Sequence, residues 1–347
     1  MDRTLYALDL AKQVFQVAWV DEKMHWHDKR LSRSQVMGFF ARLAPAKVAM
    51  EACASAHHFG RALQALGHEV TLVHARYVRP FVKTNKTDQA DARAIWTAAS
   101  QPEMRPVPVK SVQQQAQLAL HRLRESRVRM RTALTNQLRG LLGEFGVVLK
   151  AGRNHALIDF RARLAQLEAL LPGAMLEELC VQGEWIERLD AHIAALERRL
   201  IALHRPDARF RELDRVPGIG RLTASCLLAT MGSAGQFGSG RQASACVGVV
   251  PRQSGTGGKV HLGPISKRGD RYLRTLLIHG ARSVIAHGKT HSPWLAALIA
   301  RRGKNVAAVA LANKNMRIAW ALITRGTPYR PQAQAGEAAL AGPMGSV

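Results

Sequence analysis

The stretch TLYALDLA (residues 4–11), followed by QVFQVAWVD (residues 13–21), decides how the fold begins. Both segments are rich in apolar, β-branched and aromatic residues, and a polar, turn-prone stretch comes after the second one. This composition is typical of neighbouring strands. We therefore predict that the fold starts with a pair of β-strands.

Downstream of this pair, segments of strand length alternate with segments of helical spacing. KVAMEAC (47–53) and HEVTLVH (68–74) have the apolar character of strands, whereas LSRSQVMGFFARL (31–43) and FGRALQAL (59–66) have helical spacing. Strands that alternate with helices are typical of an α/β layer with helices on the faces of the sheet. The first part of the chain is therefore predicted to be an α/β domain.

The next predicted helix carries two acids in the stretch NKTDQADARAIW (85–96). Asp88 and Asp91 are three positions apart, so their side chains share one helix face, with Cβ atoms about 5–6 Å apart, and repel each other. A positive group is expected between them. Arg93 and Lys86 are the ordinary surface candidates, and a bound cation is the alternative.

The charge of the chain points to a polyanionic partner. Lys and Arg total 50 and Asp and Glu total 25, so the formal net charge is +25. The segment HRLRESRVRMR (121–131) alone holds five arginines and one glutamate, which a surface of mixed charge would not produce. We predict nucleic acid as the partner, ahead of an anionic membrane.

Asp9 and Glu51 complete a set of four acids with Asp88 and Asp91. Asp9 stands near the end of the first predicted strand and Glu51 near the end of a later one, where ligand-binding groups are common. Each acid taken alone is explained as a surface charge. Together they would repel nucleic acid unless divalent cations bridged the two. Mg²⁺ prefers such hard oxygen ligands and supports phosphoryl transfer, so the set predicts a magnesium-dependent active site.

The cysteines and the apolar runs indicate in which cellular compartment the protein is located. Cys53, Cys180, Cys226 and Cys246 show neither a C-x-x-C pair nor zinc-site spacing, and they are predicted to be reduced and structural. No signal-peptide pattern is found, and no apolar run approaches the roughly 18 residues of a membrane span. We expect a cytoplasmic protein that associates with the nucleoid when it binds DNA.

Long helices are predicted after the proline-punctuated segment 101–109. Four apolar residues recur every seven positions: Leu179, Ile186, Ile193 and Leu200. A second set follows each of them by three positions: Gln182, Leu189, Leu196 and Leu203. This heptad spacing predicts a coiled-coil seam. Pro172-Gly173 and the stretch 143–152 interrupt the helices, so an antiparallel hairpin within the chain and pairing with another subunit both remain open.

A mostly helical third region begins near Arg205-Pro206 and contains VPGIG (216–220). This turn resembles the hairpin of a helix-hairpin-helix element, in which backbone N–H groups hold a phosphate. Gly218 and Gly220 are then candidate nucleic-acid contacts. The alternative is a tight interhelical turn without a ligand.

The Gly-rich, basic segment 249–274 is predicted to be a loop that approaches phosphate closely. It is not a Walker A loop, because Lys259 is followed by valine. Ser254 and Thr256 offer hydroxyls, so the segment is either a basic backbone clamp or the source of a nucleophile. Its candidate nucleic-acid contacts are Lys259, Lys267, Arg268, Arg271 and Arg274. The tail from about Pro331 is predicted to be disordered.

Taken together, these motifs resemble bacterial insertion-sequence transposases of the one-hundred-and-ten family, particularly its eleven-eleven subgroup. The matching motifs follow the order of the family over nearly the whole chain: LDLAK with Asp9, MEAC with Glu51, KTDQADA with Asp88 and Asp91, VPGIG, RQ-x-A-x-x-x-G at 241–248, and PRQ…GGK…ISKRGD…LR.

The resemblance implies three domains and a tail. Residues 1–108 would form an α/β RNase H-like (RuvC-like) domain whose DEDD acids bind Mg²⁺. Residues 109–205 would form a coiled-coil helical insertion, and residues 206–330 a mostly helical transposase domain with a hydroxyl nucleophile, followed by a disordered tail at 331–347.

The resemblance also implies partners and chemistry. Family members resemble RNA-guided recombinases that use a structured bridge RNA, encoded by the element, to choose target and donor DNA. They act as homo-oligomers, from dimers to tetramers, with active sites shared between subunits. Counted from the shared P-R-Q, the serine of the family falls on Thr256, and Ser254 lies two residues earlier; both precede a glycine.

Three hypotheses follow. The first is a recombinase that exchanges DNA strands through the four acids and a covalent Ser/Thr–DNA intermediate. The alternative is a RuvC-like, metal-dependent junction nuclease that uses activated water and needs no hydroxyl segment. A third possibility, a non-catalytic scaffold for guide RNA, leaves the four acids unexplained as a set.

Overall fold

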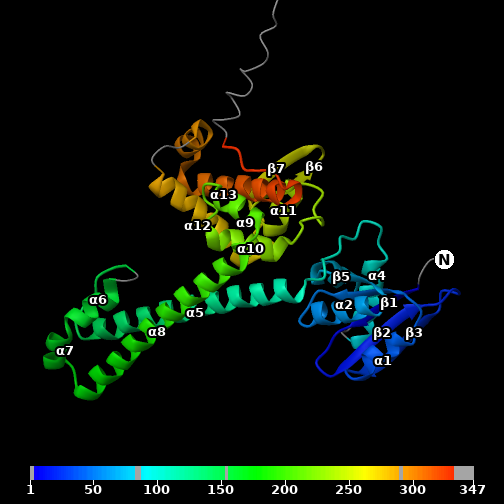
Figure 1. Ribbon diagram of the computed structural model, residues 1–347, viewed down its shortest axis with the longest axis horizontal. Coiled ribbons are helices and arrows are strands. Elements are labelled where there is room, and N and C mark those ends of the chain that lie inside the picture. Colours follow the sequence, from blue (N-terminus) through cyan, green and yellow to red (C-terminus); the bar gives the residue numbers. More distant parts are fainter. Residues whose placement is uncertain (1–3, 83–86, 153–154, 289–291, 332–347) are drawn as a thin grey trace, which may run out of the picture. The chain divides into compact units, whose positions relative to one another are not determined.

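The computed structural model describes residues 4–82, 87–152, 155–288 and 292–331. Lys86 and the predicted disordered tail beyond residue 331 lie outside the described residues. The chain divides into two compact units, Met1–Gln115 and Ala116–Val347, which Figure 1 traces in colour along the sequence. The expected boundary near residue 205 falls at the end of a long helix inside the second unit.

Unit 1 is built on a five-stranded sheet. Its strands are β1 (Leu5–Asp9), β2 (Val14–Val20), β3 (Trp26–Ser32), β4 (Lys47–Glu51) and β5 (Glu69–Val73). Its helices are α1 (Gln35–Ala41), α2 (Ala56–Ala65), α3 (Ala75–Val78), the 3₁₀ turn η1 (Arg79–Phe81) and α4 (Asp88–Ala99). The strand order is β3-β2-β1-β4-β5, with antiparallel pairing on the β2 side of β1 and parallel pairing on the β4 side. A mixed α/β N-terminal region is confirmed.

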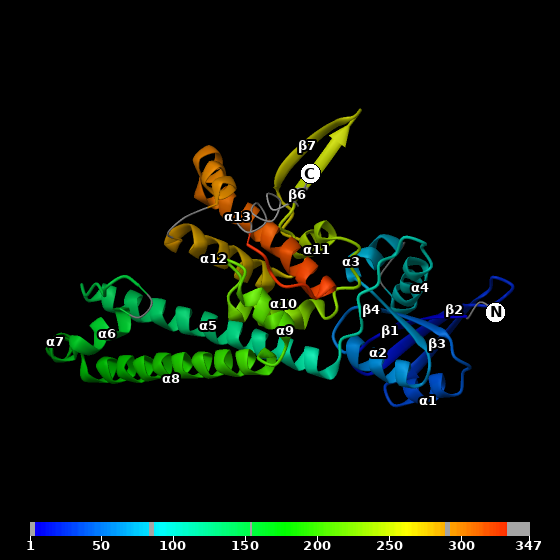
Figure 2. The ribbon, with the colours of Figure 1, turned by 45° about the horizontal axis from the view of Figure 1, so that its top comes forward.

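The two faces of this sheet pack against different helices. Leu8, Met50 and Phe15 are fully buried with side chains of α1 and α2. Ala7 directly precedes Leu8, and Ala49 directly precedes Met50. These two alanines are buried on the opposite face of the sheet, against α4. Successive side chains in a strand point to opposite faces, which accounts for the alternation. Figure 2 shows α1 and α2 on one side of the sheet and α4 on the other.

Strand β3 was not predicted, and its segment was assigned to a polar turn and to the start of a helix. The strand reads WHDKRLS, and only Leu31 is buried. It lies at the edge of the sheet and pairs with β2 through its backbone. Edge strands tolerate polar side chains on both faces, so apolar periodicity cannot identify them.

Unit 2 is mostly helical. Its helices are α5 (Val112–Glu144), which begins at the end of unit 1, α6 (His155–Ala162), α7 (Leu164–Leu170), α8 (Gly173–His204), α9 (Ala208–Asp214), α10 (Arg221–Met231), α11 (Gly240–Val247), α12 (Arg271–His287) and α13 (Pro293–Arg325). Its two strands are β6 (Pro251–Thr256) and β7 (Lys259–Ile265). None of the helices described in the structure is long and apolar enough to cross a membrane.

Helices α5 and α8 lie antiparallel within one chain (Figure 2). Arg131 of α5 pairs with Asp190 of α8, and the Gln182 side chain donates a hydrogen bond of 2.8 Å to the Leu134 carbonyl. Seven of the eight predicted heptad positions are buried or half-buried, and only Leu203 is clearly exposed. The heptad stripe of α8 therefore packs against its own chain.

The basic segment of α5 is partly neutralised by this pairing. Arg124 and Arg131 form ion pairs with acids of α8, and Arg129 pairs with Glu125 one turn away. Three of the five arginines in segment 121–131 thus have carboxylate partners. The segment contributes less free positive charge than its sequence indicates.

Candidate active site

Asp9 and Glu51 lie at the carboxyl ends of the neighbouring parallel strands β1 and β4. Leu8 is paired with Met50, so Asp9 and Glu51 are the next residues in the same register. Each follows a buried alanine by two positions, and residues two apart in a strand point to the same face. Both acids therefore lie on the face that α4 covers, and both are half-buried.

Helix α4 brings the other two acids to this edge of the sheet. The Thr87 hydroxyl caps the helix by accepting a hydrogen bond of 3.2 Å from the Ala90 N–H. Asp88 and Asp91 stand in the first turn. Asp91 is four residues before the buried Ile95, so it continues the stripe of α4 that faces the sheet. The predicted pair therefore lies on the sheet-facing side of the helix N-terminus.

The charges of the other three acids act on Asp9. The pKa of Asp9 is raised from 3.8 to about 6, first by burial and then by the charges of Asp91, Asp88 and Glu51. A nearby carboxylate raises a pKa because it disfavours a second negative charge. The four acids thus form one negatively charged cluster, which we call the acid cluster.

Arg93 does not neutralise this cluster. Its guanidinium pairs with Asp28 of β3 and lies over the Trp26 ring, 5.0 Å from the centroid. The interpretation of Arg93 as a surface partner of Asp88 and Asp91 is therefore wrong, because the antiparallel β3 edge supplies another acid. Among the residues that the structure describes, no arginine or lysine forms an ion pair with any of the four acids.

The donor types of the acid cluster fit a divalent cation. Four carboxylates without a described counter-ion supply hard oxygen ligands and uncompensated negative charge, which Mg²⁺ and similar ions require. Within the described part of the chain, no group of three or more His, Cys, Asp or Glu side chains has the spacing of a metal-binding site. The residues therefore fit such an ion in charge and chemistry without forming a closed cage.

Cys53 lies beside the acid cluster, which the sequence did not indicate. Its pKa is raised by burial and then by the charges of Glu51 and Asp9. The thiol donates a hydrogen bond of 3.4 Å to the Ala54 carbonyl. A thiol whose pKa is raised stays protonated and unreactive near neutral pH. The only signal in the sequence was its position two residues after Glu51.

The segment predicted to be a Gly-rich loop is instead a β-hairpin of β6 and β7. Thr256 pairs with Lys259, and Gly257 and Gly258 form the two-residue turn with φ of 54° and 79°. Two positive φ values are the requirement of a type I′ turn, which glycine meets without strain. Gly255 is also required, because a Cβ there would lie 2.6 Å from the Lys259 carbonyl oxygen. The glycines therefore permit the tight turn and the close strand pairing of a hairpin, and they do not form a flexible loop.

Both candidate hydroxyls lie on one face of this hairpin. Ser254 and Thr256 are two positions apart, and their cross-strand partners are His261 and Lys259. Directly paired residues share a face, with Cβ atoms about 4.5–5.5 Å apart. Every residue of β6 is exposed. The hairpin thus presents hydroxyls beside basic side chains on an accessible surface.

The remaining predicted cations follow the hairpin. Lys267, Arg268 and Arg271 are exposed. The Arg274 guanidinium donates hydrogen bonds to the carbonyls of Val247 at 2.8 Å and Arg268 at 3.0 Å, which ties α12 to the end of α11. Arg274 therefore has a structural role, whereas the side chains of Lys267, Arg268 and Arg271 are accessible to a ligand.

The VPGIG turn joins α9 to α10 and packs tightly on its Gly218 side. Gly218 has φ of 90°, and a Cβ there would lie 2.8 Å from the Asn315 side-chain nitrogen and 3.3 Å from the Gly280 carbonyl oxygen. Asn315 is buried and donates a hydrogen bond of 2.8 Å to the Pro217 carbonyl. Gly220 stands before α10 with open space around its Cβ position. Of the two glycines, Gly220 is the more accessible to a phosphate.

Two protein-family models match this chain. The model described as "Transposase IS116/IS110/IS902 family" matches residues 211–298, and a second one, described as "Transposase" and specific for DEDD enzymes of the IS110 type, matches residues 7–146. The first match includes the hairpin and the VPGIG turn, and the second includes all four acids.

Curated relatives match over almost the full length. A "Probable family 20 transposase" of Pseudomonas aeruginosa is 52% identical, over 95% of this chain and 100% of the relative. The "Transposase for insertion sequence element IS1111A" of Coxiella burnetii is 41% identical, over 95% and 92%. The "Transposase for insertion sequence element IS1328" of Yersinia enterocolitica is 40% identical, over 94% and 98%.

Proposed function

Because the chain belongs to the IS110 family of transposases, we propose that it moves an insertion sequence by cutting and exchanging DNA strands through its acid cluster and a hydroxyl of its hairpin. The enzyme is a DNA transposase. The observation that carries the mechanism is the shared face of Asp9, Glu51 and α4, whose first turn holds Asp88 and Asp91.

The acid cluster would hold the divalent metal that DEDD enzymes imply, and we propose Mg²⁺. Asp9, Glu51, Asp88 and Asp91 would supply the oxygen ligands. When bound, the ion stabilises the negative charge that develops on the attacking and leaving oxygens. Asp9 must lose its proton to act as a ligand, because metal binding competes with protonation. Its pKa of about 6 leaves it ionised at neutral pH.

We propose a covalent step at the hairpin. The hydroxyl oxygen of Thr256 or Ser254 attacks the phosphorus and loses its proton, a protein–DNA phosphoester forms, and the bond from phosphorus to the leaving sugar oxygen breaks. That oxygen takes up a proton. Attack by the hydroxyl of another DNA strand reverses the sequence, so the energy of the phosphodiester is conserved. Lys259, paired with Thr256, can neutralise charge on the phosphate.

The domain assignments remain part of this proposal. Unit 1 would be the RuvC-like domain, the α5–α8 pair a coiled-coil insertion, and the remainder of unit 2 a transposase domain with a helix-hairpin-helix element at 216–220. A structured RNA would select target and donor DNA, and the enzyme would act as a dimer or tetramer. The net charge of +25 supports binding of both nucleic acids.

The experiment that tests the covalent step compares Thr256→Ala with Ser254→Ala. Each purified variant is incubated with its RNA, cognate DNA and Mg²⁺, then denatured and examined for protein linked to a DNA end. We favour Thr256, so Thr256→Ala should lose the adduct and Ser254→Ala should keep it. Thr256→Ser should retain it, because the hydroxyl is preserved.

Thr275→Ala is the matched control, since Thr275 is an exposed threonine of the same unit whose hydroxyl bonds to the Arg271 carbonyl. It should form the adduct normally. If the wild-type protein releases hydrolysed DNA ends without any adduct, the junction-nuclease alternative replaces the covalent mechanism.

A further inference from the structure

A hollow on unit 2 carries two arginines from two different helices. Its volume is about 530 Å³, and it lies between the start of α11 and the second half of α13. The residues that line it are Ser239, Gly240, Arg241, Arg317, Trp320 and Ala321. No acid is among them. None of these residues belongs to the acid cluster or to the β6–β7 hairpin.

The two arginines have no partner among the residues that the structure describes. Neither guanidinium forms an ion pair there or donates a hydrogen bond to a described side chain or carbonyl, and both residues are exposed. Many other arginines of unit 2 are paired, as Arg188 is with Glu184 and Arg215 with Glu212. Two unpaired guanidiniums at one acid-free hollow form a local site of positive charge.

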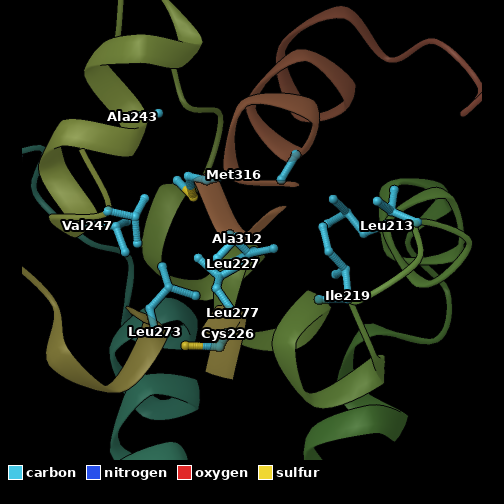
Figure 3. Packing of buried hydrophobic residues seen from close by; sticks show 14 of the residues in the cluster. Leu213, Ile219, Cys226, Leu227, Ala243, Val247, Leu273, Leu277, Ala312 and Met316 are labelled. Carbon is cyan, nitrogen blue, oxygen red and sulfur yellow. The ribbon is translucent and has the colours of Figure 1, made fainter. Parts of the chain in front are cut away.

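The two helices that carry the arginines pack closely against each other. Figure 3 shows Ala243 and Val247 of α11 close to Ala312 and Met316 of α13 in the core of unit 2. At Gly240 a Cβ would lie 3.1 Å from the Arg317 Cα, so the two helices are in close contact where the hollow begins. Only glycine permits this approach without a shift.

Trp320 forms the apolar wall of the hollow. Its indole N–H donates a hydrogen bond of 3.2 Å to the Phe237 carbonyl, which fixes the ring. Because its polar atom is used, the part of the ring that lines the hollow offers apolar surface. Two guanidiniums beside such a surface suit a phosphate with its attached sugar, since guanidinium binds phosphate oxygens in pairs.

We propose that this hollow binds a phosphodiester of the nucleic-acid backbone, with Arg241 and Arg317 as its ligands. The inference rests on the proposed function only in taking nucleic acid as the source of the phosphate. The phosphodiester is common to DNA and RNA, and the experiment separates the two. Backbone contacts of this kind position a nucleic acid without reading its sequence.

The test measures binding of the full-length protein to a duplex DNA and, separately, to a single-stranded RNA of the same sequence, from about 50 to 200 mM salt. The variants are Arg241→Gln, Arg317→Gln and the double variant. Each single substitution should weaken binding roughly tenfold at low salt. It should also lower the log–log salt slope by about 0.9 on duplex DNA or about 0.7 on a single strand.

Two further variants sharpen the result. Arg317→Lys keeps the charge but loses the paired geometry, so it should preserve the salt slope and weaken binding less than Arg317→Gln. Arg188→Gln removes one exposed charge of α8, outside the hollow, and should leave both slopes unchanged.

A lower salt slope on only one of the two probes supports the site and identifies whether the bound phosphodiester belongs to DNA or to RNA. Slopes that equal the wild-type value on both probes would overturn the proposal. Cleavage of labelled cognate DNA by wild type and by Asp88→Asn tests the proposed function separately: loss of cleavage in Asp88→Asn supports that function whatever the slopes of the arginine variants show.

Discussion

Asp9 and Glu51 stand at matching ends of β1 and β4 on the sheet face that α4 covers. Burial and three neighbouring carboxylates raise the pKa of Asp9 from 3.8 to about 6. The folded protein therefore binds this proton more tightly than the unfolded chain does. It follows that the stability of the metal-free protein falls as the pH rises from about 4 through about 6.

Asp9→Asn should remove this loss of stability. In EDTA the variant should unfold at a higher temperature than wild type above pH 6, and the difference should shrink as the pH falls through about 6 and then below 3.8, where wild-type Asp9 becomes protonated in both the folded and the unfolded state. Thermal denaturation across this range measures it. Glu103→Gln, an exposed acid of unit 1, should show no such pH dependence. A difference that is the same at every pH would contradict the raised pKa.

Added Mg²⁺ should stabilise the wild-type protein at neutral pH. A ligand that binds only the folded state stabilises it by about 2.7 kcal/mol at 100 times its dissociation constant. The midpoint of thermal unfolding should therefore rise with Mg²⁺ concentration, and it should rise less in Asp9→Asn. NaCl at equal ionic strength is the control for screening. Equal gains in both proteins would place the ion elsewhere.

Asp88→Asn and Asp91→Asn should each reduce strand cleavage by at least about 100-fold. The substitution preserves the shape of the side chain but removes a negative metal ligand. Stability should change by no more than about 1 kcal/mol, since loss of the favourable helix-dipole interaction is offset by reduced repulsion. Cleavage of labelled cognate DNA measures the effect.

Gln89→Ala is the matched control for the acid pair. Gln89 lies between the two acids in sequence, but its side chain bonds to Asp28 of β3. Its substitution should leave cleavage close to the wild-type rate. Full activity of both asparagine variants would instead assign Asp88 and Asp91 to the protein surface.

Gly218→Ala should destabilise the protein by about 1–3 kcal/mol, because the alanine would need φ of 90° and would crowd Asn315 and Gly280. Gly220→Ala is the matched comparison, since φ is −79° and the Cβ position is open. It should cost much less stability. Chemical denaturation of both variants measures the difference, and equal losses would show that packing against α12 and α13 is not what requires Gly218.

Much of unit 1 could be predicted because its core strands are apolar. TLYALDLA and KVAMEAC are short apolar runs with a carboxylate near their end, and burial on a sheet requires that composition. The order of the strands and helices other than β3, α3 and η1, and the position of Asp9 and Glu51 at strand ends, followed from it. The spacing of Asp88 and Asp91 was sufficient to place them on one helix face.

Partners in space were decided only by the tertiary structure. Arg93 pairs with Asp28 because β3 forms the sheet edge, and β3 carries too few apolar residues to be recognised in sequence. Cys53 lies next to the acid cluster because of how β4 ends, and not because of any cysteine spacing.

Unit 2 shows the same division. Heptad spacing identified the apolar stripe of α8, but the spacing is the same whether the partner helix lies within the chain or in another subunit. The structure shows α8 in contact with α5 of its own chain. The hydroxyls of Ser254 and Thr256 were evident in the sequence. Their common face depends on cross-strand pairing with His261 and Lys259, which exposed strands without an apolar pattern do not reveal.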